Sequence, residues 1–318
     1  MCKLHFDRDF ESARADAARL QGLRERLVRR ASMMAALRRW FASEGFLEVE
    51  SSVRIPDPAL EDYIDAVESG TGHWLRTSPE LRLKRLLAAG FQRIFEIGPC
   101  FRAGESGDHH REEFTMLEWY RVGGTWETLM DDAQGMVALA LEATNPGCTT
   151  IPFRGELVDF SGKWERLTVE EAFARYAGCT LREAIDQGRF EETLCLEVEP
   201  HLGIKRPLFL TEYPRECSGL SAPLEGRTDT VARWELYVGG LEIGNACTEL
   251  ADAADQEVRF QKTAELRNSE GRQVYPMDQA YMNALWNGFP LCAGTAIGLD
   301  RLAMVLTNAS DIAQVRAF

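Results

Sequence analysis

IFEIGPCFR (residues 94–102) and FTMLEWYRV (114–122) are two apolar runs separated by the polar, glycine-bearing residues 103–113. Both runs are rich in aromatic and β-branched residues, which predicts a strand in each. A short polar loop between two strands predicts that they pair antiparallel. These two strands are therefore the centre of the expected fold.

Side chains along the second strand alternate between the two faces of the sheet. One face is expected to carry Phe114, Met116, Glu118 and Tyr120. The other is expected to carry Thr115, Leu117 and Trp119, which can pack against helices. One face therefore presents an aromatic ring, an acid and a phenol in a single row.

Outward from this pair, the chain alternates helical and strand-like segments. Helices are predicted at 9–42, 79–90, 126–143, 168–177, 180–187, 252–268 and 279–288. Further strands are predicted at 46–50, in a pair within 234–250 around Gly239 and Gly240, and at the start of 293–308, which continues as helix. Strand pairs joined by short turns predict an α+β fold with an antiparallel sheet flanked by helices, and not the βαβ alternation of a Rossmann fold.

The composition is that of a globular protein with one large domain and an appendage, since the chain has 318 residues, 45% of them hydrophobic. With 36 basic and 50 acidic residues the net charge is -14, which opposes general affinity for nucleic-acid backbones. RLKR at 82–85 is a candidate local basic patch. No export signal and no apolar run of ~18 residues is found, so a cytoplasmic protein without a membrane span is expected.

The eight cysteines show no CxxC pair and no histidine at metal-ligand spacing. Isolated reduced thiols are the expected state, and a zinc site is not expected.

The loop between the two central strands is a candidate ligand site. The guanidinium of Arg102 suits a phosphate or carboxylate bidentately, and His110 and Arg111 add donors. The ring of Phe114 can stack on a planar base, an interaction worth ~1–3 kcal/mol. An acid beside a phenol, as in Glu118 and Tyr120, can hold an ammonium group. A surface hairpin with solvated charges and Phe114 in the core explains the same stretch about equally well.

Two further segments favour the ligand site. Two adjacent predicted strands carry four acid or amide side chains, Glu235, Glu242, Asn245 and Glu249. Burial of such groups without cations is costly, so Mg²⁺ and a substrate ammonium are natural partners. Simple strand alternation would place Glu242 on the opposite face from Asn245 and Glu249. The three can therefore serve one pocket only if the strand has a kink at Gly244; otherwise they belong to two separate subsites. An exposed acidic edge is the alternative. In AGTAIGLDRL, small residues precede Arg301 and let the backbone approach a ligand.

Three patterns follow one another along the chain: FR–loop–F, EIGN…EL and GxxxGxDR. Together they resemble motifs 2 and 3 of class II aminoacyl-tRNA synthetases of the lysyl type. The phrases WLRTSPELRLKRLLAAG, EFTMLEWYR and LDRL resemble the elongation factor P–(R)-β-lysine ligases, free-standing paralogues of these synthetases. The similarity begins at about residue 31. It implies an N-terminal helical extension (1–30) and a catalytic domain (31–318) without an anticodon-binding domain, in a homodimer.

The resemblance also implies the site residues, with ATP and Mg²⁺ as cofactors. Arg102 would hold the substrate carboxylate and the α-phosphate, and Arg301 the γ-phosphate; these are the implied catalytic residues. The implied nucleotide and metal residues are His110, Arg111, Phe114 (adenine), Ile243, Gly298, and Glu235 and Glu242 (Mg²⁺). The implied amino-acid residues are Ser78, Glu80 and Glu118 along the pocket, Tyr120 and Glu249 at the distal ammonium, and Asn245 at the carboxylate side.

The implied reaction activates lysine or (R)-β-lysine as an adenylate and transfers it to a lysine side chain of elongation factor P. No protein nucleophile is required. Two other functions stay open: a truncated synthetase-like enzyme that aminoacylates tRNA or another RNA, and a non-catalytic lysine- or adenylate-binding regulator. The net charge counts against tRNA, and the retention of Arg102, Glu235, Glu242 and Arg301 counts against a regulator.

Four positions depart from the family pattern. Gly104 replaces the motif 2 glutamate, with Glu105 next to it, and Ser52 replaces the motif 1 proline. Cys247 stands where the lysine pocket normally has an aromatic residue, which implies a wider pocket. Gly244 matches the synthetases, whereas many of the ligases have alanine, so α- and β-lysine both stay open as substrates.

Overall fold

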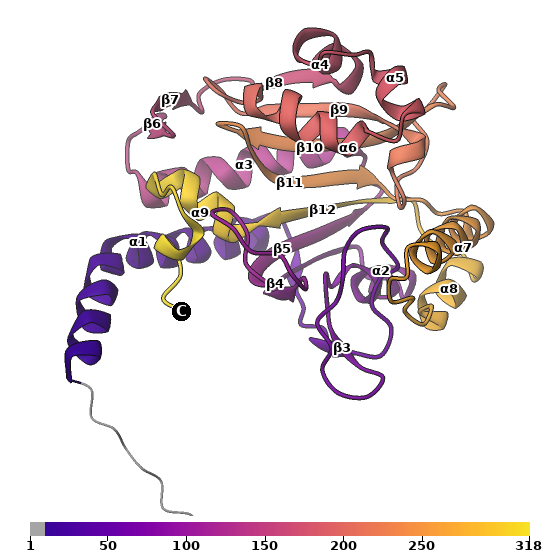
Figure 1. The fold of residues 1–318 in the computed structure, drawn as a ribbon, viewed down its shortest axis with the longest axis horizontal. Coiled ribbons are helices and arrows are strands. Elements are labelled where there is room, and N and C mark those ends of the chain that lie inside the picture. Colours follow the sequence, from indigo (N-terminus) through magenta and orange to yellow (C-terminus); the bar gives the residue numbers. More distant parts are fainter. Residues whose placement is uncertain (1–9) are drawn as a thin grey trace, which may run out of the picture.

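A computed structural model describes residues 10–318, and its centre is an eight-stranded sheet (Figure 1). The strands lie in the order β1 (Leu47–Glu48), β4 (Arg93–Phe101), β5 (Glu113–Val122), β12 (Cys292–Gly298), β11 (Leu241–Thr248), β10 (Thr230–Val238), β9 (Leu208–Pro214) and β8 (Glu165–Thr168). The five inner pairings are antiparallel, and the two edge pairings, β1–β4 and β8–β9, are parallel. The predicted α+β architecture is confirmed.

The helices match the predicted segments closely, except for the short α6, which was not predicted. They are α1 (Phe10–Ser43), α2 (Glu80–Ala88), α3 (Trp126–Thr144), α4 (Val169–Tyr176), α5 (Leu181–Asp186), α6 (Phe190–Thr193), α7 (Ala253–Ser269), α8 (Gln279–Trp286) and α9 (Leu299–Thr307). Two small hairpins stand apart from the main sheet, β2 (Arg54–Ile55) with β3 (Trp74–Leu75), and β6 (Thr150–Phe153) with β7 (Glu156–Asp159). The strand predicted at 46–50 is shorter than expected, since only the two residues of β1 pair in register at the sheet edge.

One face of the sheet packs on α1, α3 and α9. The buried Trp119 of β5 contacts the ring of Phe41 on α1, with 5.3 Å between centroids, and Leu117 belongs to the same cluster. The predicted alternation along β5 is therefore correct. Helix α3 begins at a capping box on Thr125, which fixes where this layer starts.

The opposite face is covered at both ends, by α4, α5 and α6 over β9 and β8, and by α2, α7 and α8 over the other end. Tyr120 of β5 packs there with Leu81 of α2 and Tyr281 of α8 in a second cluster. Figure 1 shows α7 and α8 beside α2, past the end of β12. The middle of this face is left for the site described below.

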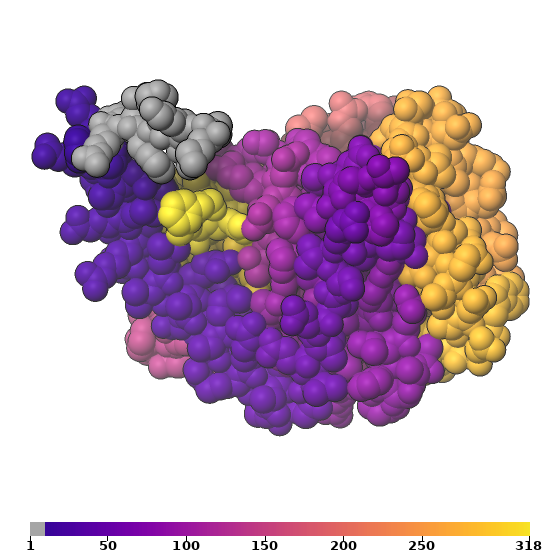
Figure 2. Space-filling view, turned by 90° about the horizontal axis from the view of Figure 1, so that it is seen from below, coloured from indigo at the N-terminus to yellow at the C-terminus, as the bar shows by residue number. Residues whose placement is uncertain are grey.

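Helix α1 continues without a break across residues 30 and 31. Arg30 forms an ion pair with the buried Asp300, with 2.7 Å between Nη2 and Oδ1, and Arg29 donates to the carbonyl of Thr144. Its first turns project away from the body in Figure 1, and Figure 2 shows the last residues of the chain beside this helix. Arg19 accordingly donates to the carbonyl of Ala317. The division of the chain at residue 30 stays a prediction.

Two further predictions concern the chain as a whole. None of the helices within residues 10–318 is long and apolar enough to cross a bilayer. The seven cysteines that the structure describes are all free thiols, as expected, whereas Cys2 lies outside the described residues.

Candidate active site

The site is built from two rows of side chains that cross the sheet. In the first row Glu118, Ala296, Asn245 and Glu235 pair directly across β5, β12, β11 and β10. In the second row Tyr120, Gly294, Cys247 and Arg233 do the same. Directly opposed residues in a sheet point to the same face, so strands from three distant parts of the sequence form one surface.

A β-bulge resolves the parity of Glu242. Leu236 pairs with Gly244, but the next residue, Tyr237, pairs with Glu242, which leaves Ile243 without a partner. The extra residue reverses the alternation, so Glu242 joins Asn245 in lining one cleft. Glu249 lies instead in a second, buried cluster. Both the predicted kink beside Gly244 and the predicted separate subsite are found.

The cleft encloses about 610 Å³ of empty space, its open mouth included, which is in the usual range for a small-molecule site. Nine of the residues predicted to serve the nucleotide or the substrate line it: Arg102, His110, Arg111, Phe114, Glu242, Ile243, Asn245, Gly298 and Arg301. The guanidinium of Arg102 lies 5.1 Å from the centroid of the Phe114 ring. Phe114 is therefore at the ligand surface, and its alternative position in the core is excluded.

Cationic and imidazole groups crowd the end of the cleft near Arg301. Its Nη2 lies 2.5 Å from Nε2 of His110, and its Nη1 donates to the carbonyl (2.9 Å) and carboxylate (3.1 Å) of Glu242. Arg154, at the turn between β6 and β7, contacts the ring of His109. Burial and nearby guanidiniums lower the pKa of both His109 and His110. This end is arranged for a ligand of high negative charge.

Two carboxylates suited to a divalent cation are Glu242, which contacts Arg301 and lines the cleft, and Glu235, which is not among the lining residues. Glu235 is buried and accepts from Arg233 (2.5 Å) and from the hydroxyl of Tyr237 (2.7 Å). Burial raises the pKa of Glu235, Arg233 opposes this, and Glu242 adds to it. Burial, Glu242 and Glu235 likewise raise the pKa of Glu199 to about 7.

Within residues 10–318 no cluster of three or more histidine, cysteine, aspartate or glutamate side chains is arranged to hold a metal alone. Magnesium in nucleotide sites is commonly held by one or two carboxylates and the phosphates. The pair Glu235 and Glu242 fits that mode of binding.

Except for Asn245, which lines the cleft, the predicted amino-acid residues form a separate, largely buried cluster. Ser78 Oγ donates to Glu118 Oε2 at 2.9 Å, and the Tyr120 hydroxyl donates to Glu118 Oε1 at 2.6 Å. Burial and the charge of Glu80 raise the pKa of Glu118 to about 8. The backbone N–H of Glu80 donates back to Ser78 Oγ. Four of the predicted residues are thus in direct contact.

Lys84 completes this cluster, a role that the sequence pattern did not predict. Its Nζ lies 2.6 Å from Glu80 and 2.5 Å from Glu249, in a fully buried position. Burial alone would lower the pKa of Lys84, but Glu249 and Glu80 raise it well above its usual value. Its spacing of four residues from Glu80 on a predicted helix was the available sequence signal.

The basic patch considered at 82–85 is therefore wrong. Arg82 pairs with Asp57 and with the buried Asp278, and Lys84 faces inward. Only Arg85 keeps a largely exposed side chain near these acids. The acids that neutralise this stretch come from distant parts of the chain, so the run of four residues could not reveal them.

The small residues of β12 serve both ends of the site. A Cβ at Gly294 would fall 2.2 Å from Tyr120 Cε1 and 2.4 Å from Glu249 Oε1, so this glycine makes room for the amino-acid cluster. A Cβ at Gly298 would meet Arg301 at ordinary contact distance, 3.8 Å from Cδ. Protein atoms alone require a glycine at Gly294, and the close approach of a ligand to this strand stays a prediction.

The departures from the family pattern have local explanations. Gly104 has a φ of 78°, which favours glycine, and its N–H donates to Glu112 at 2.8 Å. Glu105 lines the cleft with a carboxylate oxygen 3.8 Å from Arg102. At Gly244 a Cβ would fall 2.2 Å from the carbonyl oxygen of Ala296, so glycine fits this backbone tightly. Ser52 is exposed.

The chain is similar to known proteins along almost its whole length. The sequence profile of the class II tRNA synthetases (D, K and N) matches residues 9–318. The chain belongs to this family. A lysine–tRNA ligase of Magnetococcus marinus is 34% identical over 93% of the chain, and one of Campylobacter jejuni is equally similar; the chain spans 64% of the length of each. An elongation factor P–(R)-β-lysine ligase of Salmonella gallinarum is 33% identical over 92% of the chain and 94% of its own length. The resemblance drawn from the motifs is confirmed.

Proposed function

We propose that the protein is an ATP-dependent, AMP-forming ligase that activates lysine or (R)-β-lysine and attaches it to a lysine side chain of elongation factor P. The observation that carries this proposal is the opposite charge at the two ends of one sheet surface. Arg102, His110 and Arg301 gather at one end, and Glu80, Glu118 and Glu249 at the other. A triphosphate and a diamino acid are ligands with the matching charges.

In the first step an oxygen of the substrate carboxylate attacks the α-phosphorus of ATP. The bond from that phosphorus to the bridging oxygen breaks, and pyrophosphate leaves. Arg102 would hold the reacting carboxylate and the α-phosphate, Arg301 would hold the γ-phosphate, and Phe114 would stack on the base. Glu235 and Glu242 would hold Mg²⁺, which neutralises phosphate charge. Orientation and charge stabilisation then supply the rate enhancement.

In the second step the neutral ε-amine of the acceptor lysine attacks the carbonyl carbon of the adenylate. An amide bond forms, AMP leaves with the electron pair of the broken bond, and the amine releases one proton. No covalent intermediate on the protein is needed. The free thiols of the site region, such as the partly buried Cys247, therefore need no catalytic role.

Elongation factor P is favoured as acceptor by the match along nearly the whole length of its ligases. The net charge of -14 and the neutralised RLKR stretch both disfavour a nucleic-acid surface. A homodimer acting in the cytoplasm, and a catalytic domain over residues 31–318, are parts of the same proposal.

A direct test uses purified protein with ATP, Mg²⁺, radiolabelled lysine or (R)-β-lysine, and either elongation factor P or bulk tRNA. Label on elongation factor P is expected, with one of the two amino acids preferred. Label that accumulates on tRNA, and not on the protein acceptor, would overturn the proposal in favour of RNA aminoacylation. The glycine at 244 and the identity to lysine–tRNA ligases are the observations that favour this second candidate.

The partial reaction distinguishes the proposed enzyme from a non-catalytic regulator. Amino-acid-dependent exchange of labelled pyrophosphate into ATP is expected even without an acceptor. Binding of lysine or ATP with no exchange in either case would instead identify a regulator.

A further inference from the structure

One more carboxylate reaches the amino-acid cluster from a loop that no motif covers. Glu61 lies in the loop between β2 and β3, and its side chain is partly buried. Its Oε2 accepts a long hydrogen bond of 3.4 Å from Thr77, the residue directly before Ser78. The loop therefore brings Glu61 to the edge of the pocket that Ser78, Glu80 and Glu118 form.

Glu61 also lies beside the arginine that would hold the substrate carboxylate. The carbonyl of Asp65, in the same loop, accepts from the N–H of Ala103 at 2.7 Å, which ties the loop to the residue after Arg102. Burial raises the pKa of Glu61 to about 7, Arg102 opposes this, and Glu80 adds to it. Among the ion pairs of residues 10–318, none includes the Glu61 carboxylate, whereas Glu80 and Glu249 share Lys84.

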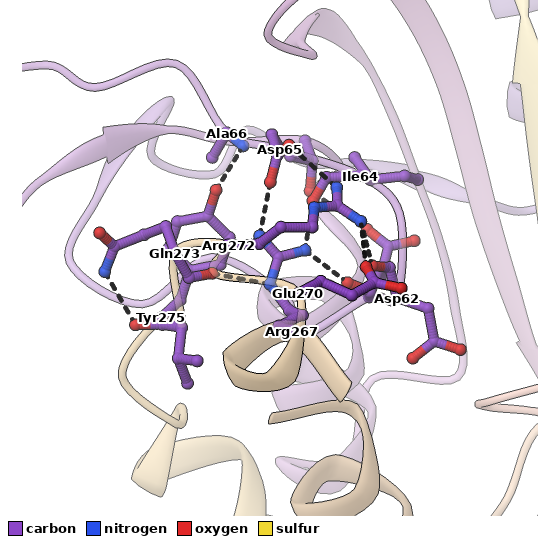
Figure 3. Close-up of polar contacts among 12 residues, drawn as sticks. Asp62, Ile64, Asp65, Ala66, Arg267, Glu270, Arg272, Gln273 and Tyr275 are labelled. Atoms are coloured by element: carbon purple, nitrogen blue, oxygen red, sulfur yellow. Dashed lines mark hydrogen bonds and ion pairs between the residues drawn. The ribbon is translucent and has the colours of Figure 1, made fainter. Parts of the chain in front are cut away.

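A clamp from α7 and the segment after it holds this loop (Figure 3). Arg267, whose side chain is fully buried, donates to the carbonyls of Glu61 (2.7 Å) and Ile64 (3.0 Å) and pairs with Asp65 at 2.5 Å. Arg272 donates to the carbonyl of Asp62 at 2.6 Å and pairs with Asp65 at 2.9 Å.

Farther along the loop, the N–H of Ala66 donates to the Tyr275 hydroxyl at 2.8 Å, as Figure 3 also shows. The backbone is therefore fixed at Glu61 itself and at several of the residues that follow it. A carboxylate on so firmly held a loop keeps its position without the ligand, as a specificity residue must.

We propose that Glu61 binds the substrate ammonium nearer to the reacting carboxylate, while Glu249 binds the distal one. This inference rests on the proposed function, and it makes the carboxylate of Glu61 a specificity residue for diamino acids. Lysine and (R)-β-lysine both carry an ammonium one or two carbons from the carboxylate. A carboxylate beside Arg102 meets that group with a charge-assisted hydrogen bond. A monoamino analogue such as 6-aminohexanoate leaves Glu61 unpaired.

The experiment compares Glu61→Gln with wild type in pyrophosphate exchange, using lysine, (R)-β-lysine and 6-aminohexanoate. The variant is expected to raise KM for the preferred diamino acid by about 30- to 100-fold, the size of a hydrogen bond between charged groups. KM for ATP should not change, and exchange with 6-aminohexanoate should stay within about twofold of wild type. Glu68→Gln, which removes an exposed carboxylate farther along the same segment, is the matched control.

The variant is expected to fold, because glutamine resembles the protonated carboxyl that the raised pKa favours. Asp65→Asn is a second variant, which weakens the clamp but leaves the carbonyls that Arg267 binds. A smaller rise in KM for the diamino acid, again without effect on 6-aminohexanoate, is expected for it.

Each outcome is decisive for the role of Glu61. Equal losses with diamino and monoamino substrates would show a merely structural role and overturn the inference, as would an unchanged KM in Glu61→Gln. In either case the proposed function stands, because exchange itself persists. If wild type supports no exchange with any of the three amino acids, the proposed function fails and the inference fails with it.

Discussion

The two ends of the site hold like charges together, but of opposite sign. At the nucleotide end Arg301 contacts His110 and the carbonyl of His109, Arg154 contacts the ring of His109, and the pKa of each histidine is lowered. At the amino-acid end the acids outnumber the single buried lysine, and the pKa of Glu118 rises to about 8 and that of Glu249 to about 7. Each arrangement is unfavourable in the free protein and is relieved by a ligand of the opposite charge.

The ends differ in burial as well as in sign. Arg301 and Glu242 remain partly exposed, with 20% and 30% of their side chains accessible, whereas Lys84 and Glu249 are almost completely buried. Water screens the first pair and not the second. The amino-acid end is therefore the more rigid and selective half, while the nucleotide end can adjust as the triphosphate and its metal arrive.

The strongest test of this difference between the two ends is to remove Lys84, the cation of the acidic end. Lys84→Met leaves Glu80 and Glu249 buried without a counter-ion, which costs about 3–5 kcal/mol of stability in comparable cases. Urea denaturation should show this loss, and added lysine should restore part of it, because its ammonium meets the same acids. Arg85→Met, on the more exposed side of the same helix, is the control. A variant as stable as wild type would contradict the pairing.

At the opposite end, Arg301→Ala removes the cation that contacts both Glu242 and His110. Loss of one preorganised group that stabilises developing charge typically lowers kcat by about 10²–10³-fold. Exchange kinetics should show that loss together with weaker ATP binding, while calorimetric binding of the amino acid alone should be unchanged. An equal loss of amino-acid binding would mean that the two ends are not separate.

Glu249→Ala is the converse substitution at the acidic end. Exchange that depends on the diamino acid is expected to fall by about 100-fold or more, since Glu249 would hold the distal ammonium. ATP binding should stay measurable, because the residue lies outside the nucleotide cleft. Exchange near the normal rate would remove Glu249 from the proposed site. Together with Arg301→Ala, this variant separates the two ligands.

Much of this arrangement could be predicted from local sequence, because strand alternation and helix punctuation are local properties. The position of Phe114 beside Arg102 and the common face of Glu118 and Tyr120 follow from the two central strands. The bulge at Ile243 could be predicted only as one of two alternatives. The spacing of the acids shows that strand alternation cannot place them all on one face, but it does not show where the alternation is interrupted.

The remaining features depend on contacts between distant segments. Glu61 is held by Arg267, 206 positions later in the chain, and nothing in the LEDY stretch indicates a pocket residue. Lys84 appeared as part of a basic run because its partner Glu249 follows β11, far along the chain from α2. Local patterns cannot assign such residues, since their burial is decided by which segments meet.

The raised carboxyl pKa values predict how stability depends on pH. Glu118 binds its proton more tightly in the folded protein, with a pKa of about 8, than in the unfolded chain, where the value is 4.5. The folded state therefore holds protons that the unfolded state has released, and stability falls as pH rises from about 5 to 8. Melting temperatures should decline by a few degrees over this range.

Glu118→Gln should flatten that decline, because glutamine cannot lose a proton; its single oxygen keeps an acceptor for one of the two hydroxyls, Ser78 or Tyr120. The charges of Glu80 and Lys84, which also act on Glu118, are unchanged in this variant. Glu183→Gln is the control, since the pKa of this exposed cap residue is lowered, so its carboxyl group titrates below the pH range of the decline. A decline as steep as that of wild type would contradict the shift.

The smallest expected effect sharpens the role of burial. Arg182 and Asp186 on α5 have the same four-residue spacing as Glu80 and Lys84, but their side chains are 64% and 58% exposed. Water screens such a pair, and holding two long side chains together costs entropy, so exposed pairs contribute little. Arg182→Met should shift the melting temperature by less than about one degree, within error of wild type. A loss of stability as large as that in Lys84→Met would mean that the spacing of the pair, and not its removal from water, stabilises α2. The contrast between the exposed and buried charges of this protein would then have no physical basis.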